Sequence, residues 1–343
     1  GEKSVLGLSD AIATNLLYNH LTGGSAEVSE MTAALSEFIN DDGGFAWIGG
    51  MSSSPIVTAT VLERNARVRA RTGKGFLNDD ILASAVLYLD GRVTRGIPGK
   101  VQAWSPDVSL GTYLFVRSFY PEVKFAPASG DSGTAKQMKE FASSAQKYLF
   151  PSDVRSLPGS IFAKVLRLAT LENLYALKDG ENLLKGWNVG KQSTVDVLKS
   201  MREDIASLVE YAVPHRDGGI YFPNLVMPYR GLLSSEAYCH SLLCDLLAPY
   251  EPATADGIRL WLLLQKETQS WTNDFSFTNA VASIMGGTEK LKNTSVMVLS
   301  KSYERPYREM AAAGNGFRIS RHFVLTSADG KQSVLKTGGS VSA

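Results

Sequence analysis

Cysteine is scarce in this chain of 343 residues, which contains only Cys239 and Cys244. The two stand five positions apart within one apolar helical pattern, so their side chains point to different faces of the helix. A disulfide between them is therefore not expected. Two cysteines alone leave the redox compartment of the protein open.

Long apolar runs and an excess of charge are also missing. No uninterrupted apolar run approaches the length of a bilayer span. The opening residues "GEKSVLG" have no hydrophobic signal-peptide region, which predicts a mature chain or an excised piece. Lys and Arg number 35 against 34 Asp and Glu, a formal charge of +1. This balance argues against nucleic acid or an anionic membrane as a partner.

Apolar residues, by contrast, make up 44% of the chain, enough to bury a large core. At this length the chain is expected to form two domains or one domain built from repeats. Apolar spacings of three and four predict helices from residue 10 to about 300, most clearly at 31–39, 81–89, 108–119, 161–177 and 204–213. Strand-like alternation begins only at 316–325, where Phe317, Ile319 and Phe323 share one parity before the turn signal "SADG".

A glycine-rich string occurs twice, as "NDDGGFAWIGG" at 40–50 and "HRDGGIYFPN" at 215–224. Each string follows an apolar helical pattern and precedes a serine-rich approach to a second one. Ser54, with Pro55 after it, is the expected N-cap in the first copy, and Ser234 or Ser235 in the second. A degenerate third copy runs through 258–285 and a fourth through 102–116. Helical hairpins that recur in this way bury their faces by stacking into a solenoid or a closed ring.

The repeated turns are predicted to be structural. Their glycines allow positive φ and close backbone approach, their aspartates can bond backbone N–H groups, and the neighbouring aromatic rings fill the gap between hairpins. The predicted turn residues are Asp42, Gly43, Gly44, Phe45, Trp47, Asp217, Gly218, Gly219, Tyr221, Phe222, Gln265 and Trp271. We expect that a β-branched residue at Gly44 or Gly219 would destabilise the fold by roughly 1 to 3 kcal/mol if the backbone there has positive φ.

The order of these motifs resembles the α/α toroid shared by terpenoid cyclases, protein prenyltransferases and the thioester domains of the complement and α2-macroglobulin families. Bacterial α2-macroglobulin-like proteins are the most similar. Their thioester domain resembles residues 42–73 in its Gly-Gly-aromatic-Trp turn and following helix, and residues 270–285 in its final tryptophan turn and helix. Such proteins then enter a β-sandwich through a segment similar to residues 303–325. The resemblance spans about residues 5–340.

The resemblance departs from the family at the thioester itself. Members that carry a thioester have a Cys-x-Glu-Gln motif at the start of the domain, where the cysteine attacks the glutamine amide. The corresponding stretch here, "LGLSDAIATNLLYNHL", has neither cysteine nor glutamine between Leu6 and Ile12, and neither Cys239 nor Cys244 is followed by Glu-Gln. We therefore expect no thioester, no catalytic residue and no cofactor.

Enzymes of the toroid class remain the alternative. The pairs Asp41 with Asp42 and Asp79 with Asp80 lack the further carboxylate of a DxDD or DDxxD motif, so turns and helix caps are favoured there. A prenyltransferase-like zinc site would use Asp, Cys and His; the candidates for a metal site or pocket are Glu236, Cys239, His240 and Asp245. A packed helix explains the same cluster. A carbohydrate-active pair of carboxylates, distant in sequence, stays open.

Two further segments have plain interpretations. The basic run "ERNARVRARTGKG" places Arg64, Arg67 and Arg71 on one helical face, which favours a solvated or ion-paired surface over a phosphate site, or a contact with a neighbouring domain. The small and polar residues at 126–137 predict a surface loop between helices.

Together these observations predict an all-α fold: an α/α toroid at 1–298, followed at 299–343 by a β-prone segment that begins a truncated macroglobulin-type β-sandwich. The resemblance implies a non-enzymatic domain of a periplasmic or extracellular protein, with membrane anchoring through a preceding part. Its implied role is protease inhibition or cell-envelope defence without covalent capture. The implied partners are proteases, bound by the full-length protein, and neighbouring β-sandwich domains.

Overall fold

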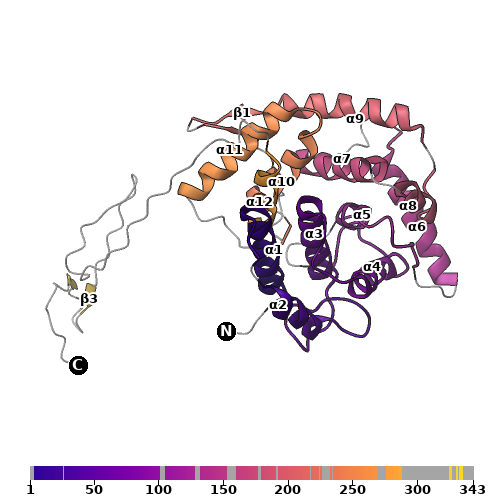
Figure 1. Cartoon of the computed structure of the whole chain (residues 1–343), viewed down its shortest axis with the longest axis horizontal. Coiled ribbons are helices and arrows are strands. Elements are labelled where there is room, and N and C mark those ends of the chain that lie inside the picture. The colour runs from indigo at the N-terminus through magenta and orange to yellow at the C-terminus, as the bar shows by residue number, and fades with distance from the viewer. Residues whose placement is uncertain are drawn as a thin grey trace. The chain divides into compact units, whose positions relative to one another are not determined.

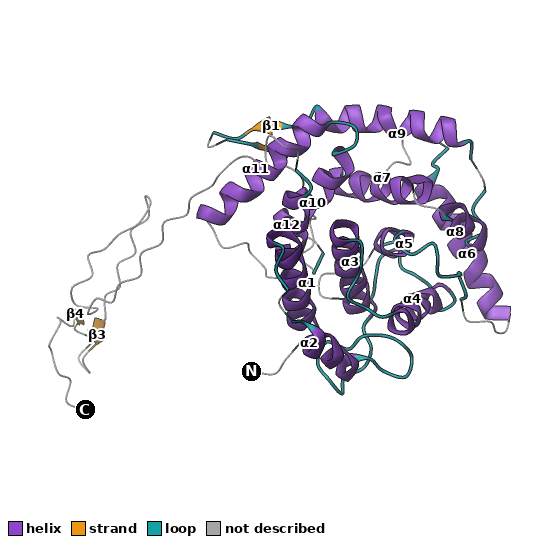
Figure 2. Ribbon diagram, in the orientation of Figure 1, coloured by secondary structure: helices purple, strands orange, loops and turns teal. Residues whose placement is uncertain are grey.

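The structure is a computed structural model. It describes residues 4–25, 27–100, 105–127, 132–152, 160–176, 179–190, 192–216, 218–223, 225, 232–233, 235–268, 276–287, 324–326, 330 and 332–334. Within these residues helices dominate, and the only strands are two short antiparallel pairs, so the all-α class is confirmed (Figure 2).

The helices follow the chain in this order: α1 (Val5–Thr22), α2 (Ser29–Ala34), the 3-10 helix η1 (Leu35–Phe38), α3 (Pro55–Thr72), α4 (Asp79–Val93), α5 (Leu110–Ser118), α6 (Ser132–Leu149), α7 (Ile161–Ala176), α8 (Gly180–Gly186), α9 (Thr194–Val209), α10 (Glu236–Leu247), α11 (Pro252–Thr268) and α12 (Phe277–Met285). Strand β1 (Val213–Pro214) pairs with β2 (Ile220–Tyr221), and β3 (Val324–Thr326) pairs with β4 (Gln332–Val334).

The packing divides the chain into two compact units, residues 1–296 and 297–343. In the second unit, β3 and β4 flank Gly330, which has a φ of 78° near the turn expected from "SADG". The strand-like residues Phe317, Ile319 and Phe323 lie outside the described residues. That this unit begins a truncated β-sandwich remains a prediction.

Two helices begin at the predicted caps: Ser54 caps α3 ahead of Pro55, and Ser235 caps α10. At the start of α4 the cap is Asn78, whose Oδ1 accepts from the N–H of Ile81 at 2.8 Å, and Asp79 and Asp80 follow in the first turn. Such caps satisfy N–H groups that the helix itself cannot reach. The alternative cap, Ser234, lies outside the described residues.

The loop predicted at 126–137 is wrong in its second half, because α6 begins at Ser132. The buried apolar face of α6 lies in its second half, where Phe141, Ala145 and Leu149 are spaced four residues apart. Gly133, Ala135 and Lys136, near the start of this helix, are exposed, and the small and polar composition of this stretch suggested a loop.

In the first unit, six helices contact one another in sequence. Helix α1 contacts α3, α3 contacts α5, α5 contacts α7, α7 contacts α10, α10 contacts α12, and α12 contacts α1 (Figure 1). The others lie against this series: α4 packs on α3, α6 on α4, α5 and α7, α8 and α9 on α7, and α11 on α10 and α12. None of the described helices is both long and apolar enough to cross a bilayer.

Candidate functional site

The two glycine-rich strings form turns with the same pattern of backbone hydrogen bonds. In the first, the N–H of Asn40 donates to Gly44 O and the N–H of Gly43 donates to Asn40 O. In the second, the N–H of His215 donates to Gly219 O and the N–H of Gly218 to His215 O. Antiparallel pairing closes both turns, between Ile39 and Phe45 and between Pro214 and Ile220. The repeat detected in the sequence is thus a repeated hairpin.

Positive φ, predicted for the turn glycines, is present at Gly43, Gly218 and Gly219 but not at Gly44. At Gly44 the lack of room for a side chain requires glycine, because an added Cβ would lie 2.6 Å from Ser53 Cβ and 2.7 Å from the Tyr88 ring. In each copy one glycine also lies against the backbone of a neighbouring helix, α4 in the first copy and α11 in the second. A Cβ on Gly43 would meet Ser84 O of α4 at 2.6 Å, and one on Gly219 would meet the Trp261 N of α11 at 2.6 Å.

The other predicted turn residues have differing surroundings. Asp42 Oδ1 accepts from the N–H of Gly44 at 3.0 Å and from Ser53 Oγ at 2.6 Å, as expected of an aspartate in a turn. Phe45 and Phe222 are fully buried, Trp47 is partly buried, and Tyr221 stacks on Trp261. Gln265, predicted at a turn, lies inside α11. Asp217 and Trp271 lie outside the described residues.

The four metal or pocket candidates share α10 or its start, but each has a different surrounding. His240 is fully buried; its Nε2 accepts from the N–H of Phe222 at 3.0 Å and its Nδ1 faces Glu236 O at 2.8 Å. Cys239 is also fully buried, and Asp245 binds arginines. Among the described residues, no three His, Cys, Asp or Glu side chains gather to hold a metal ion. Both imidazole nitrogens of His240 are already engaged by the backbone.

His240 should make the fold sensitive to acid. Burial lowers the pKa of His240 from its ordinary value of 6.5 to about 4, with a smaller opposing effect of the Glu236 carbonyl. The unfolded chain therefore binds a proton at a pH where the folded chain does not, and stability present above pH 6.5 is lost as the pH falls toward 4. We expect a loss of up to about 3 kcal/mol from this residue, measured by urea unfolding across that range.

A matched pair of variants isolates this effect. His240→Gln keeps an acceptor for the Phe222 N–H but cannot gain a proton, so the pH dependence should flatten between 6.5 and 4. His20→Gln, at an exposed position near the end of α1, should leave the dependence of the unmodified chain in place. Parallel curves for His240→Gln and the unmodified chain would contradict the assignment.

An extended cluster of polar side chains is centred on α3, in the basic run. We call it the α3 charge network. Its members are Asp10 of α1, Glu63, Arg64, Arg67 and Arg71 of α3, Tyr238 and Asp245 of α10, and Asn279 of α12. Three guanidinium groups thus face three carboxyl groups. The basic run is ion-paired, as one of the sequence interpretations held, but it lies largely inside the protein.

Glu63 is the innermost acid of the network, with 1% of its surface exposed. Its Oε1 accepts from Asn279 Nδ2 at 3.1 Å and from Arg67 Nη2 at 3.3 Å, and its Oε2 accepts from the Tyr238 hydroxyl at 2.9 Å. Burial raises the pKa of Glu63, while the charge of Arg67 and these donors oppose the shift. Both carboxylate oxygens are therefore occupied by protein donors.

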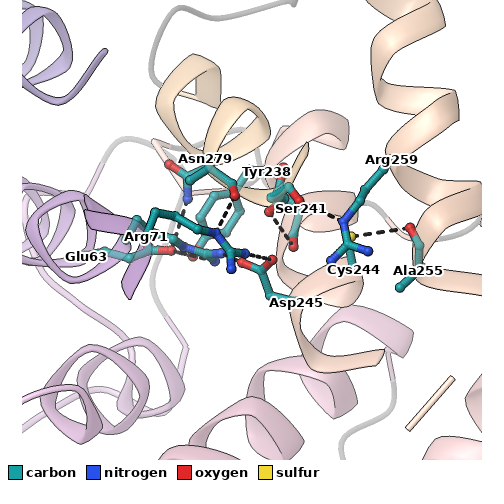
Figure 3. A network of polar contacts seen from close by, with 12 residues as sticks. Glu63, Arg71, Tyr238, Ser241, Cys244, Asp245, Ala255, Arg259 and Asn279 are labelled. Carbon is teal, nitrogen blue, oxygen red and sulfur yellow. Dashed lines mark hydrogen bonds and ion pairs between the residues drawn. The ribbon is translucent and has the colours of Figure 1, made fainter. Parts of the chain in front are cut away.

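Asp245 joins two of the arginines. Arg67 Nη1 binds Asp245 Oδ2, and Arg71 Nη2 donates to Asp245 Oδ1 at 2.9 Å. Figure 3 shows Arg71 and Asp245 facing one another, with Tyr238 and Asn279 next to Glu63. Burial acts to lower the pKa of Arg67, but the charges of Asp245 and Glu63 raise it overall. The pairing therefore keeps Arg67 charged inside the protein.

The opposite end of the network reaches α1. Arg64, 1% exposed, donates from Nη1 to Leu6 O and to Ser9 Oγ at 2.8 Å, and its Nη2 lies 3.7 Å from Asp10 Oδ1. Burial lowers the pKa of Arg64, and Asp10 opposes the shift. Arg64 thus ties the first half of α1 to α3.

Local spacing could have suggested only part of this network. Glu63 and Arg67 stand four apart, a spacing typical of helical ion pairs. The contacts of Glu63 with Tyr238 and Asn279 cross 175 and 216 residues. No local pattern marks these partners.

The carboxylate pairs weighed for catalysis are peripheral. Asp41, Asp79 and Asp80 are exposed, the last two in the first turn of α4. Comparisons with known proteins add no identification: no protein-family model matches the chain, and no curated protein matches it.

Proposed function

We propose that residues 1–298 form an α/α toroid and act as a non-enzymatic, thioester-domain-like module of a bacterial α2-macroglobulin-like protein. The module would support protease inhibition or envelope defence without forming a covalent bond. In this proposal the parent is periplasmic or extracellular, and β-sandwich domains flank the toroid.

The order of helix contacts carries the proposal. Six helices contact one another in succession and the last, α12, returns to the first, α1. Closure of this kind is what stacked helical hairpins produce when they form a ring. The same hairpin turn precedes α3 and α10, each the first of a helix pair, which supports a repeated unit.

The α3 charge network supports a structural role for the module. Its acids and bases bind one another and the backbone, and they join α1, α3, α10 and α12. A carboxylate poised for catalysis needs an oxygen within reach of a substrate. Both oxygens of Glu63 are taken by protein groups, which favours a rigid scaffold.

The test uses the longer protein that contains this chain. A protease held by it should lose activity on large substrates, keep activity on small ones, and be released intact by SDS. Fluorescent cadaverine, which reacts with thioesters, should not be incorporated. Covalent conjugates or cadaverine uptake would contradict the non-covalent mechanism, and failure to retain any of a panel of proteases would contradict the inhibitor role. Stoichiometric zinc that is lost in Cys239→Ser and His240→Gln would favour the enzyme alternative.

A further inference from the structure

Helix α12 is short, yet it packs against four other helices. Its nine residues contact α1, α3, α10 and α11. An isolated helix of this length is not stable in water. The position of α12 therefore depends on these four neighbours.

The buried face of α12 is small and polar. Thr278, Asn279 and Ser283 are buried, and the only apolar side chains among its buried residues are those of Ala280 and Ala282. Its larger apolar residues, Phe277, Val281, Ile284 and Met285, are only partly buried, the last three of them packed against the core. In a usual amphipathic helix the large apolar side chains are the most buried ones.

Hydrogen bonds of its side chains attach this face to three of the four neighbours. Thr278 donates to Asp10 of α1 at 2.6 Å, Asn279 to Glu63 of α3 at 3.1 Å, and Ser283 Oγ to the Ser241 carbonyl of α10 at 3.1 Å.

Arginines bind the end of the helix. Arg71 Nε donates to the carbonyl of Ala282, and Arg259 Nε donates to that of Ser283 at 2.8 Å. Carbonyls in the last turn of a helix have no partner within it, so these arginines act as its C-terminal cap.

Helix α5 provides a comparison of equal length. It also has nine residues, but it buries the large side chains of Tyr113, Leu114, Phe115 and Val116. Burying one such side chain stabilises a helix against its neighbours more than one hydrogen bond does in net terms. The attachment of α12 is therefore specific in geometry but weaker than that of α5.

We propose that α12 is a latch that opens as one cooperative unit while the rest of the helical unit stays folded. Opening separates α12 from α1 and α10 and interrupts the series of contacts between them. The inference concerns the folded chain itself and is independent of the parent protein's function.

Native-state hydrogen exchange of the full chain, followed by mass spectrometry, tests the latch. In the unmodified chain, the amides of α12 should exchange through a lower-energy opening than those of α5. Thr278→Val removes the bond to Asp10 with little change of shape and should speed exchange in α12 roughly five- to tenfold, with no change in α5. Thr170→Val is the matched control, because that buried hydroxyl bonds only within α7.

Three results would overturn the latch. One is equal opening of α12 and α5 in the unmodified chain, a measurement that needs no variant to fold. Another is faster exchange everywhere in Thr278→Val, which would mean that α12 opens only with global unfolding. The third is unchanged exchange in α12 of that variant.

Discussion

Replacing Arg67 with methionine is expected to lower the free energy of unfolding by about 3–5 kcal/mol. Methionine keeps much of the side-chain length but removes the charge that faces Glu63 and Asp245. Glu63 has 1% of its surface exposed, so water cannot replace the lost partner. Urea unfolding followed by circular dichroism measures the loss, and an unchanged m-value would show that the unfolded state is not altered.

A double variant provides a second test of the Glu63–Arg67 pair. Removing one partner leaves an uncompensated buried charge, whereas removing both costs less. The double variant Glu63→Gln with Arg67→Met should therefore lose less stability than the sum of the two single variants. Glutamine keeps acceptor and donor groups near Tyr238 and Asn279. Additive losses would show that Glu63 and Arg67 do not act as a pair.

An exposed ion pair serves as the control. Lys136 and Glu140 of α6 lie 3.8 Å apart, with side chains 74% and 55% exposed. Lys136→Met should cost less than about 0.5 kcal/mol, because water solvates the glutamate once the lysine is gone. If Arg67→Met lowers the free energy of unfolding by less than about 1 kcal/mol, the ion pairs of Arg67 contribute no more than exposed pairs do. That result would contradict the buried network.

The fold was predictable where the causes are local. A hairpin turn depends on a few consecutive residues, so the strings around Gly43 and Gly218 indicated two turns with the same hydrogen bonds from sequence alone. The caps at Ser54 and Asn78 are also local. The turn predicted at Gln265 was wrong, because the repeat pattern was extended to a residue that lies inside the continuous helix α11.

The α3 charge network shows why the candidate site was harder to predict. Arginines spaced along a helix usually face water. Nothing within residues 63–75 indicates that Tyr238 and Asn279 bind Glu63. Burial of Glu63 and Arg64 depends on where α1, α10 and α12 finally pack. Spacing indicated that Arg64, Arg67 and Arg71 share a helical face, but only the tertiary structure places much of that face inside.

Replacing Gly219 with alanine is expected to destabilise the chain by about 3–5 kcal/mol, more than the range expected from positive φ alone. Gly219 has a φ of 79°, which an L side chain rarely adopts. The added Cβ would also lie 2.6 Å from Trp261 N and 2.7 Å from Gly257 O. These are backbone atoms of α11, so relief requires that the turn or the helix move.

Gly73 separates the two contributions. It has a φ of 81° at the end of α3, with nothing within 4 Å of an added Cβ. Gly73→Ala should therefore cost only about 1 kcal/mol, the expense of the backbone conformation. Equal losses at the two positions in urea unfolding would show that the contact with α11 is unimportant.

Tryptophan fluorescence distinguishes a moved turn from general loosening. The Trp261 ring stacks on Tyr221 at 6.3 Å and lies 4.2 Å from the His240 ring, so a displacement of α11 by the Gly219→Ala methyl group changes both neighbours. Under native conditions the emission of the Gly219→Ala variant should differ from that of the unmodified chain, while Gly73→Ala should not change it. The close approach of this turn to α11 is thus what requires glycine at position 219.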